Sequence, residues 1–163
     1  MTTASSAPTH TMTMPGDREL RVERIFNASR DRVWKAYTDP KLVAQWWGRG
    51  NKLDIEVMDL KPGGRWRFIE HAGEKPFGFE GEYREITPQE RIVQTFGWDG
   101  MPGNSILETA VFEDLGDGRT KVISTSVFST PEERTEMLGY GMEAGMAESY
   151  AALDRLLAEN RDS

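Results

Sequence analysis

The chain has 163 residues, a length typical of one domain, and its five Trp, seven Phe and four Tyr can supply a hydrophobic core. Its net charge of −7 argues against a general nucleic-acid binder, which needs a basic surface for the phosphates. The absence of cysteine excludes a disulfide framework, a thiol nucleophile and a zinc–thiolate site, and no apolar run is long enough to insert into and span a membrane.

The two ends of the chain are predicted to lie outside the folded domain. Residues 1–18 are rich in Thr, Ser, Ala and Pro and lack a periodic apolar pattern, so we predict a disordered N-terminal tail. Nothing in that tail has the layout of a signal peptide, and we expect a cytoplasmic protein. The domain itself is predicted to span 19–159, followed by a short C-terminal tail, 160–163.

A strand and two short helices open the predicted domain. Alternating apolar residues over 19–26 predict the first strand. Ser29 is a candidate N-cap for a short amphipathic helix. Asp39 and Pro40 repeat that signal, with a capping side chain before a proline at the first helical position, and Gly48 ends this second helix.

Six further strands are predicted, separated by short turns without intervening helices. Gly63 and Gly64, for example, follow Pro62 in a turn that favours positive φ. Because short turns join antiparallel neighbours, these segments predict one antiparallel sheet of seven strands in all. The six segments are 52–60, 65–71, 77–86, 91–98, 105–114 and 119–128.

One long helix is predicted from Pro131 to about Glu159. Thr130 and Glu133 form a capping box around Pro131 at the first helical position. Placed at 100° per residue, one face gathers residues that would lie across the sheet, and Tyr140 points away from it. The face comprises Leu138, Met142, Gly145, Ser149, Leu153 and Leu156, with Gly141 at its edge.

This order of elements is that of the helix-grip fold, an α+β architecture in which an antiparallel sheet wraps around a long C-terminal helix. The local motifs resemble those of the Hsp90 ATPase activator homologue 1-like family, within the wider START/Bet v 1 superfamily. They are Ala28-Ser-Arg-Asp-Arg-Val-Trp-Lys-Ala-Tyr-Thr-Asp-Pro40, Trp46-Trp47-Gly48, Asp59-Leu-Lys-Pro-Gly-Gly64 and Gly81-Glu-Tyr-Arg-Glu-Ile-Thr-Pro-Gln-Glu-Arg-Ile92. Arg49 departs from the pattern, since relatives often have proline after Trp-Trp-Gly.

The resemblance implies a cavity between sheet and helix that can hold an apolar molecule. Side-chain parity along the strands assigns a dense set of aromatic residues to one face of the sheet, together with the polar Glu108, Gln94, Glu70 and Tyr83. An ordinary aromatic core with polar groups at its rim remains the alternative. The candidate ligand-binding residues are Trp46, Trp47, Trp66, Phe68, Phe79, Tyr83, Phe96, Trp98, Glu108, Leu138, Gly141, Met142 and Gly145.

Glu108 is the most distinctive candidate. A carboxylate that faces an apolar interior has its pKa raised by desolvation, and it can then orient a ligand or exchange a proton. The alternatives are a salt bridge to an arginine at the cavity mouth, or a β-bulge that turns the side chain outward. The glycines of the predicted helix likewise permit either close packing or open space.

Three functions remain in view. The first is a small-molecule-binding protein that takes an apolar or amphipathic ligand, lipid-like or polyketide-like, into the cavity. The second, implied by the resemblance, is a protein-interaction module like the Hsp90 co-chaperone domain. The third is a cyclase or hydrolase. We assign no catalytic residue, no metal and no cofactor, because His10 and His71 are the only histidines and no nucleophile motif accompanies them.

Overall fold

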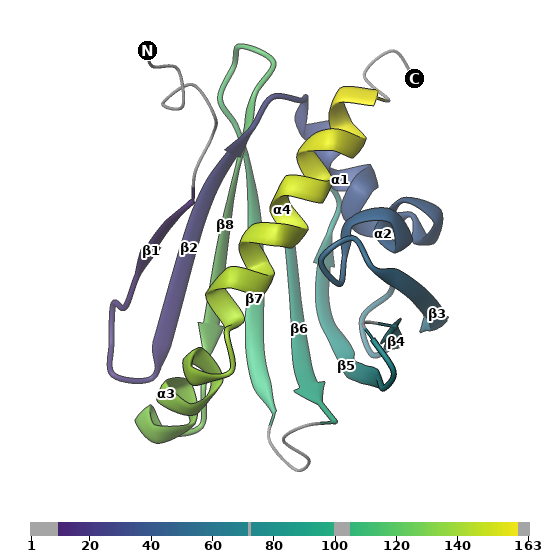
Figure 1. Ribbon diagram of the computed structural model, residues 1–163. Helices are drawn as coiled ribbons and strands as arrows, with labels where there is room; N and C mark the ends of the chain where they lie inside the picture. The colour runs from purple at the N-terminus through teal and green to yellow at the C-terminus, as the bar shows by residue number, and fades with distance from the viewer. Residues whose placement is uncertain (1–9, 72, 100–104, 160–163) are drawn as a thin grey trace, which may run out of the picture.

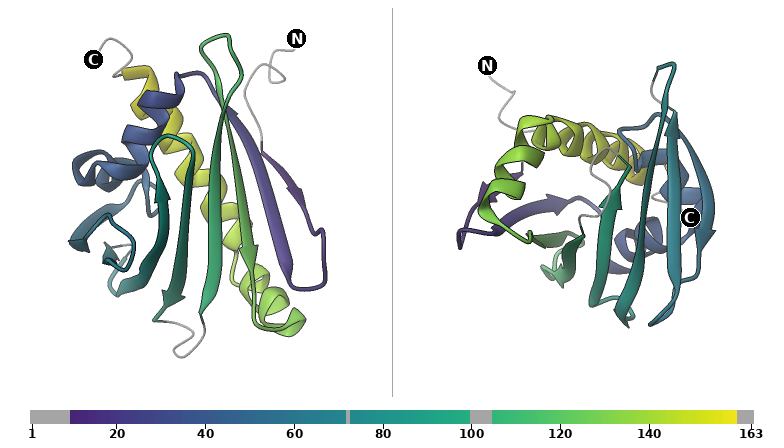
Figure 2. Two further views of the ribbon diagram at one scale, coloured as in Figure 1. Left: turned by 180° about the vertical axis from the view of Figure 1, so that it is seen from behind. Right: turned by 90° about the horizontal axis from the view of Figure 1, so that it is seen from below.

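A computed structural model describes residues 10–71, 73–99 and 105–159 (Figure 1). It has an α+β, Bet v 1-like fold in which one antiparallel sheet curves around a C-terminal helical segment, with two short helices at one end (Figures 1 and 2). The predicted C-terminal tail, 160–163, and the first half of the predicted N-terminal tail lie outside the described residues.

The two short helices begin where their capping residues predict. The Ser29 hydroxyl accepts a hydrogen bond from the backbone of Arg32, and α1 spans Arg30–Thr38. The Asp39 carboxylate accepts from the backbone of Lys41, and α2 spans Pro40–Trp46 with its proline in the first turn. These side chains satisfy backbone N–H groups that have no partner inside the helix.

The sheet has the strand order β1-β2-β8-β7-β6-β5-β4-β3, and every neighbouring pair is antiparallel. Short turns with the predicted Pro, Gly or Asp residues join β3 to β4, β5 to β6 and β7 to β8. The strands are β1 (Thr11–Thr13), β2 (Glu19–Phe26), β3 (Lys52–Met58), β4 (Arg65–His71), β5 (Pro76–Thr87), β6 (Arg91–Trp98), β7 (Ile106–Asp114) and β8 (Thr120–Val127).

The prediction of seven strands is wrong by one. Thr11–Thr13, in the segment expected to be a disordered tail, forms β1 and pairs with β2 at the edge of the sheet. Met12 lies opposite Val22 and packs against the buried core. A three-residue edge strand has too few residues to show alternation, so its sequence carries no strand signal.

The prediction of one unbroken C-terminal helix is also wrong. The segment divides into α3 (Pro131–Gly139) and α4 (Met142–Glu159). Between them Tyr140 ends α3, and Gly141 adopts φ +85°, a left-handed conformation that glycine accepts without steric cost. The 3.6-residue periodicity continues across this break, which is why the pattern predicts a single helix.

The core lies between the concave face of the sheet and the helices. Phe26, Val33, Trp66 and Leu153 are among its fully buried side chains. The indole of Trp46 donates to the carbonyl of Ala36 and thereby joins α2 to α1. Among the described helices, none is both long and apolar enough to cross a membrane.

Candidate ligand cavity

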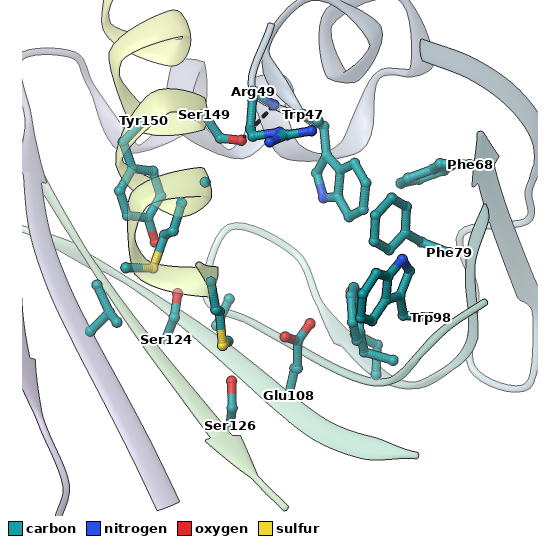
Figure 3. A pocket seen from close by; sticks show the side chains of 18 of the residues that line it. Trp47, Arg49, Phe68, Phe79, Trp98, Glu108, Ser124, Ser126, Ser149 and Tyr150 are labelled. Atoms are coloured by element: carbon teal, nitrogen blue, oxygen red, sulfur yellow. Dashed lines mark hydrogen bonds between the residues drawn. The ribbon is translucent and has the colours of Figure 1, made fainter. Parts of the chain in front are cut away.

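A cavity of about 680 Å³ lies between the concave face of the sheet and the α3–α4 segment (Figure 3). Its floor comes from β2 and β5–β8, and its roof from α4 and the loop that follows α2. The sheet curves around one side of α4 (Figure 2), and the cavity lies between this concave face and the helix.

One wall of the cavity is aromatic. Trp47, which follows α2, meets Phe68 of β4 and Phe79 of β5 edge-to-face, with ring centroids 5.1 and 5.0 Å apart. The ring centroid of Phe79 in turn lies 5.7 Å from that of Phe96 on β6. Edge-to-face ring pairs contribute more stabilising free energy than the burial of their area alone. The wall is therefore held in place without a ligand.

Trp98 and Tyr140 stand at the end of this wall. Tyr140 is exposed, yet its ring meets that of Trp98 edge-to-face at a centroid distance of 5.1 Å. The helical periodicity predicted that Tyr140 points away from the sheet; the break before α4 instead turns it toward β6. The indole N–H of Trp98 is buried and has no hydrogen-bond partner among the described residues.

A row of polar side chains crosses the apolar floor. Tyr83 pairs with Gln94, Gln94 with Glu108 and Glu108 with Ser126, on the neighbouring strands β5 to β8. All four line the cavity. Because directly opposed residues of antiparallel strands lie side by side on one face, the row forms a continuous polar strip.

Glu108 lies at the centre of that strip and points into the cavity (Figure 3). The pairing of β7 with both neighbours has no register shift, so no bulge turns the side chain outward. Burial raises the pKa of Glu108 from its ordinary 4.5 to about 7, although a hydrogen bond from Ser126 lowers it in part. The residue is half-buried, because its side chain faces the cavity.

Three hydroxyl groups meet beside this strip. The Tyr150 hydroxyl is in hydrogen-bond contact with those of Tyr37 and Ser124, and the side chain of Tyr150 reaches from α4 toward Ser124 (Figure 3). Burial raises the pKa of both tyrosines above their usual value of 10, so these hydroxyls remain uncharged at neutral pH. They offer a ligand donors and acceptors without charge.

A second polar group lies in the roof, where Arg49 follows Gly48. Its guanidinium donates to the buried carboxylate of Glu70, and its backbone N–H donates to the hydroxyl of Ser149 at 2.8 Å. Arg49 has φ +64°, which proline cannot adopt since its ring holds φ near −65°. The departure from the Trp-Trp-Gly-Pro pattern therefore belongs to a different loop conformation.

Comparison with family models identifies the family. The family model described as activator of Hsp90 ATPase homolog 1-like protein matches residues 27–158. The chain belongs to this family. A search of the curated proteins finds no match for the chain.

Solved structures of similar fold come from several bacteria. A Rhodobacter sphaeroides protein shares 25% identity at a TM-score of 0.84 and covers 93% of this chain and 99% of its own. An Arthrobacter aurescens protein shares 21% identity at a TM-score of 0.83, covering 91% of each chain. DynU16, from the dynemicin biosynthetic locus, shares 24% identity at a TM-score of 0.68, covering 90% of this chain and 49% of its own.

The structure brings most of the candidate residues of this family member to one cavity. Trp66 and Leu138 do not line it: Trp66 is fully buried with its ring centroid 4.9 Å from that of Phe68, and Leu138 of α3 packs on a second hydrophobic cluster. Those that line it are Trp46, Trp47, Phe68, Phe79, Tyr83, Phe96, Trp98, Glu108, Gly141, Met142 and Gly145.

Sequence reasoning missed several lining residues. Arg49 carries no motif of its own, and only the adjacent glycines indicate an unusual backbone. No local pattern marks Tyr37 or Tyr150 as a lining residue, and nothing local reveals that their hydroxyls meet near Ser124. Among the described residues, no group of three or more potential metal-ligating side chains occurs.

Proposed function

We propose that this protein binds an apolar or amphipathic small molecule, lipid-like or polyketide-like, in the cavity between the sheet and α4. The supporting observation is the cavity itself, which has a preformed aromatic wall and a polar strip across its floor. Its volume of about 680 Å³ lies within the usual range for small-molecule sites, which are mostly apolar with a few orienting polar groups. A close-packed core of the same size would leave no such space.

The test is a titration followed by tryptophan emission, since Trp47 and Trp98 line the cavity. A fatty acid and a polycyclic aromatic compound are added separately to the full chain. We expect a saturable change in emission for at least one of them. No saturable change in emission with either compound would contradict ligand binding and favour the alternative of a protein-interaction module, which the resemblance to the Hsp90 ATPase activator implies.

A matched pair of variants separates cavity binding from surface binding. Gly145 lines the cavity on α4, whereas a side chain added at Gly139 on α3 meets nothing within 4 Å. We expect Gly145→Leu to weaken binding at least tenfold because its side chain occupies the cavity. Gly139→Leu should leave the affinity unchanged. Equal affinities for the two variants would place the ligand outside the cavity.

A further inference from the structure

We propose that the ligand is an organic cation, an ammonium with an apolar body, whose positive charge pairs with Glu108. This inference rests on the proposed function, because it names the chemical class of ligand for the same cavity. It follows from the charges that line the cavity, the direction of the Glu108 carboxylate and the nature of the wall that it faces.

The charged residues lining the cavity leave one negative charge without a partner. The charged residues that line the cavity are Arg49, Glu70 and Glu108. Arg49 and Glu70 neutralise each other at 2.7 Å. Burial and the Ser126 hydroxyl are the influences on the pKa of Glu108, and no cationic side chain among the described residues contributes to it. The cavity therefore presents a net charge of −1 whenever Glu108 is ionised.

The surroundings of Glu108 leave the carboxylate open to a ligand. Ser126 donates to it from β8, and its other strand neighbour, Gln94, is uncharged. The carboxylate points into the centre of the cavity, between Ser126 on one side and Trp98 on the other (Figure 3). A ligand in the cavity can therefore reach the carboxylate directly.

The aromatic wall also favours a cation. The π faces of Trp and Phe attract positive charge, most strongly where water is excluded. Trp47, Phe79 and Trp98 lie along the cavity on the far side from Ser124 (Figure 3). An anion would be repelled by Glu108, and a neutral ligand would leave the buried carboxylate without a counter-charge. A cation with an apolar body satisfies both the carboxylate and the wall.

The pH dependence of binding should then follow the protonation of Glu108. The other ionisable residues that face the cavity are Tyr37 (α1), Arg49, Glu70 (β4), Tyr83 (β5), Tyr140 (between α3 and α4) and Tyr150 (α4). Burial raises the pKa of Tyr37, Tyr83 and Tyr150 above 10, which keeps them uncharged, and Arg49 and Glu70 form their own ion pair. Because the pKa of Glu108 is about 7, a ligand of fixed positive charge should bind more weakly as the pH falls below that value.

Three naphthalene probes of similar size test the charge. They are (naphthylmethyl)trimethylammonium, its uncharged isostere neopentylnaphthalene, and naphthylmethanesulfonate. Binding of each to the full chain is measured by isothermal titration calorimetry at pH 8 and pH 5.5. We expect the ammonium to bind at least tenfold more tightly than its isostere at pH 8, and this preference to shrink at least threefold at pH 5.5. The sulfonate should bind most weakly.

Two variants assign the effect to one carboxylate. Glu108→Gln removes the charge but retains the shape, and Glu113→Gln makes the same change on the exposed face of β7. We expect Glu108→Gln to abolish the preference for the ammonium while the isostere binds as before. Glu113→Gln should resemble the wild type.

The outcomes distinguish this inference from the proposed function. If the isostere binds saturably and as tightly as the ammonium, the cation proposal is overturned and ligand binding stands. If the ammonium preference persists in Glu108→Gln, the assignment to Glu108 is overturned. If none of the three probes binds, both the cation proposal and the proposed function are overturned.

Discussion

The guanidinium of Arg49 donates two hydrogen bonds to one carboxylate oxygen of Glu70, from Nε at 2.9 Å and from Nη2 at 2.7 Å. Asn51 donates a third to the same oxygen at 2.8 Å. The pair ties the loop after α2 to β4, and the Arg49 backbone ties the same loop to Ser149 of α4. The roof of the cavity is thus held by a buried carboxylate.

Arg49→Ala is expected to destabilise the fold by about 3 kcal/mol, because among the described residues it leaves the buried Glu70 carboxylate with Asn51 as its one remaining side-chain hydrogen-bond donor. Chemical denaturation at pH 7 measures the change. Arg49→Gly should be milder by about 1 kcal/mol, since glycine adopts the observed φ of +64° without strain.

A double-mutant cycle provides the control for this pair. Glu70→Gln removes the buried charge, so adding Arg49→Ala to it should cost much less than Arg49→Ala alone. Additive effects of the two substitutions would show that the ion pair does not couple the loop to β4.

The sequence predicts the elements of this fold well where their signals are local. Ser29, Asp39 and Thr130 each cap the helix that they were expected to start, and β4 and β6 have the predicted bounds. Capping and alternation depend on residues that are only a few positions apart, so both can be predicted from the sequence alone.

Features that depend on tertiary contacts are less accessible. β1 forms because β2 offers an unpaired edge, and the helix breaks at Gly141 although the apolar pattern continues. Parity placed Glu108 on the cavity face, but only the register of three strands sets it between Gln94 and Ser126. The Arg49–Glu70 pair joins residues that no local pattern connects.

The raised pKa of Glu108 should make the protein less stable as the pH rises. The folded state holds the Glu108 proton up to about pH 7, whereas the unfolded chain releases it near 4.5. The unfolding free energy therefore falls between these two pH values, by at most about 3 kcal/mol. Denaturation of wild type and Glu108→Gln is measured at pH 5 and pH 8. The unfolding free energy of the variant should increase relative to that of the wild type only at pH 8.

Glu113→Gln serves as the control for this measurement, since Glu113 is exposed on the same strand. Its difference from the wild type should be about the same at both pH values. A Glu108→Gln variant whose relative stability is equal at pH 5 and pH 8 would contradict a desolvated carboxyl group.

The break between α3 and α4 predicts opposite effects for two neighbouring glycines. Gly141→Ala should destabilise by about 1 kcal/mol, because alanine is strained at φ +85°. Gly139→Ala should stabilise by up to about 1 kcal/mol, because the position is helical and open. Thermal and denaturant unfolding measure both, and stabilisation by Gly141→Ala would indicate one continuous helix.

Gly145 tests whether the cavity is open. A Cβ at this position would lie 3.3 Å from Cδ of Arg49, the flexible stem of a partly exposed side chain. Because that stem can shift, we expect Gly145→Ala to change stability by less than about 1 kcal/mol, its gain in helix propensity offsetting the contact. Gly145→Leu should lose about 1 kcal/mol, since the Arg49 stem must move aside before the rest of the leucine side chain reaches the cavity. Denaturant unfolding of both variants would instead show losses of about 2 kcal/mol or more if α4 were closely packed on the sheet.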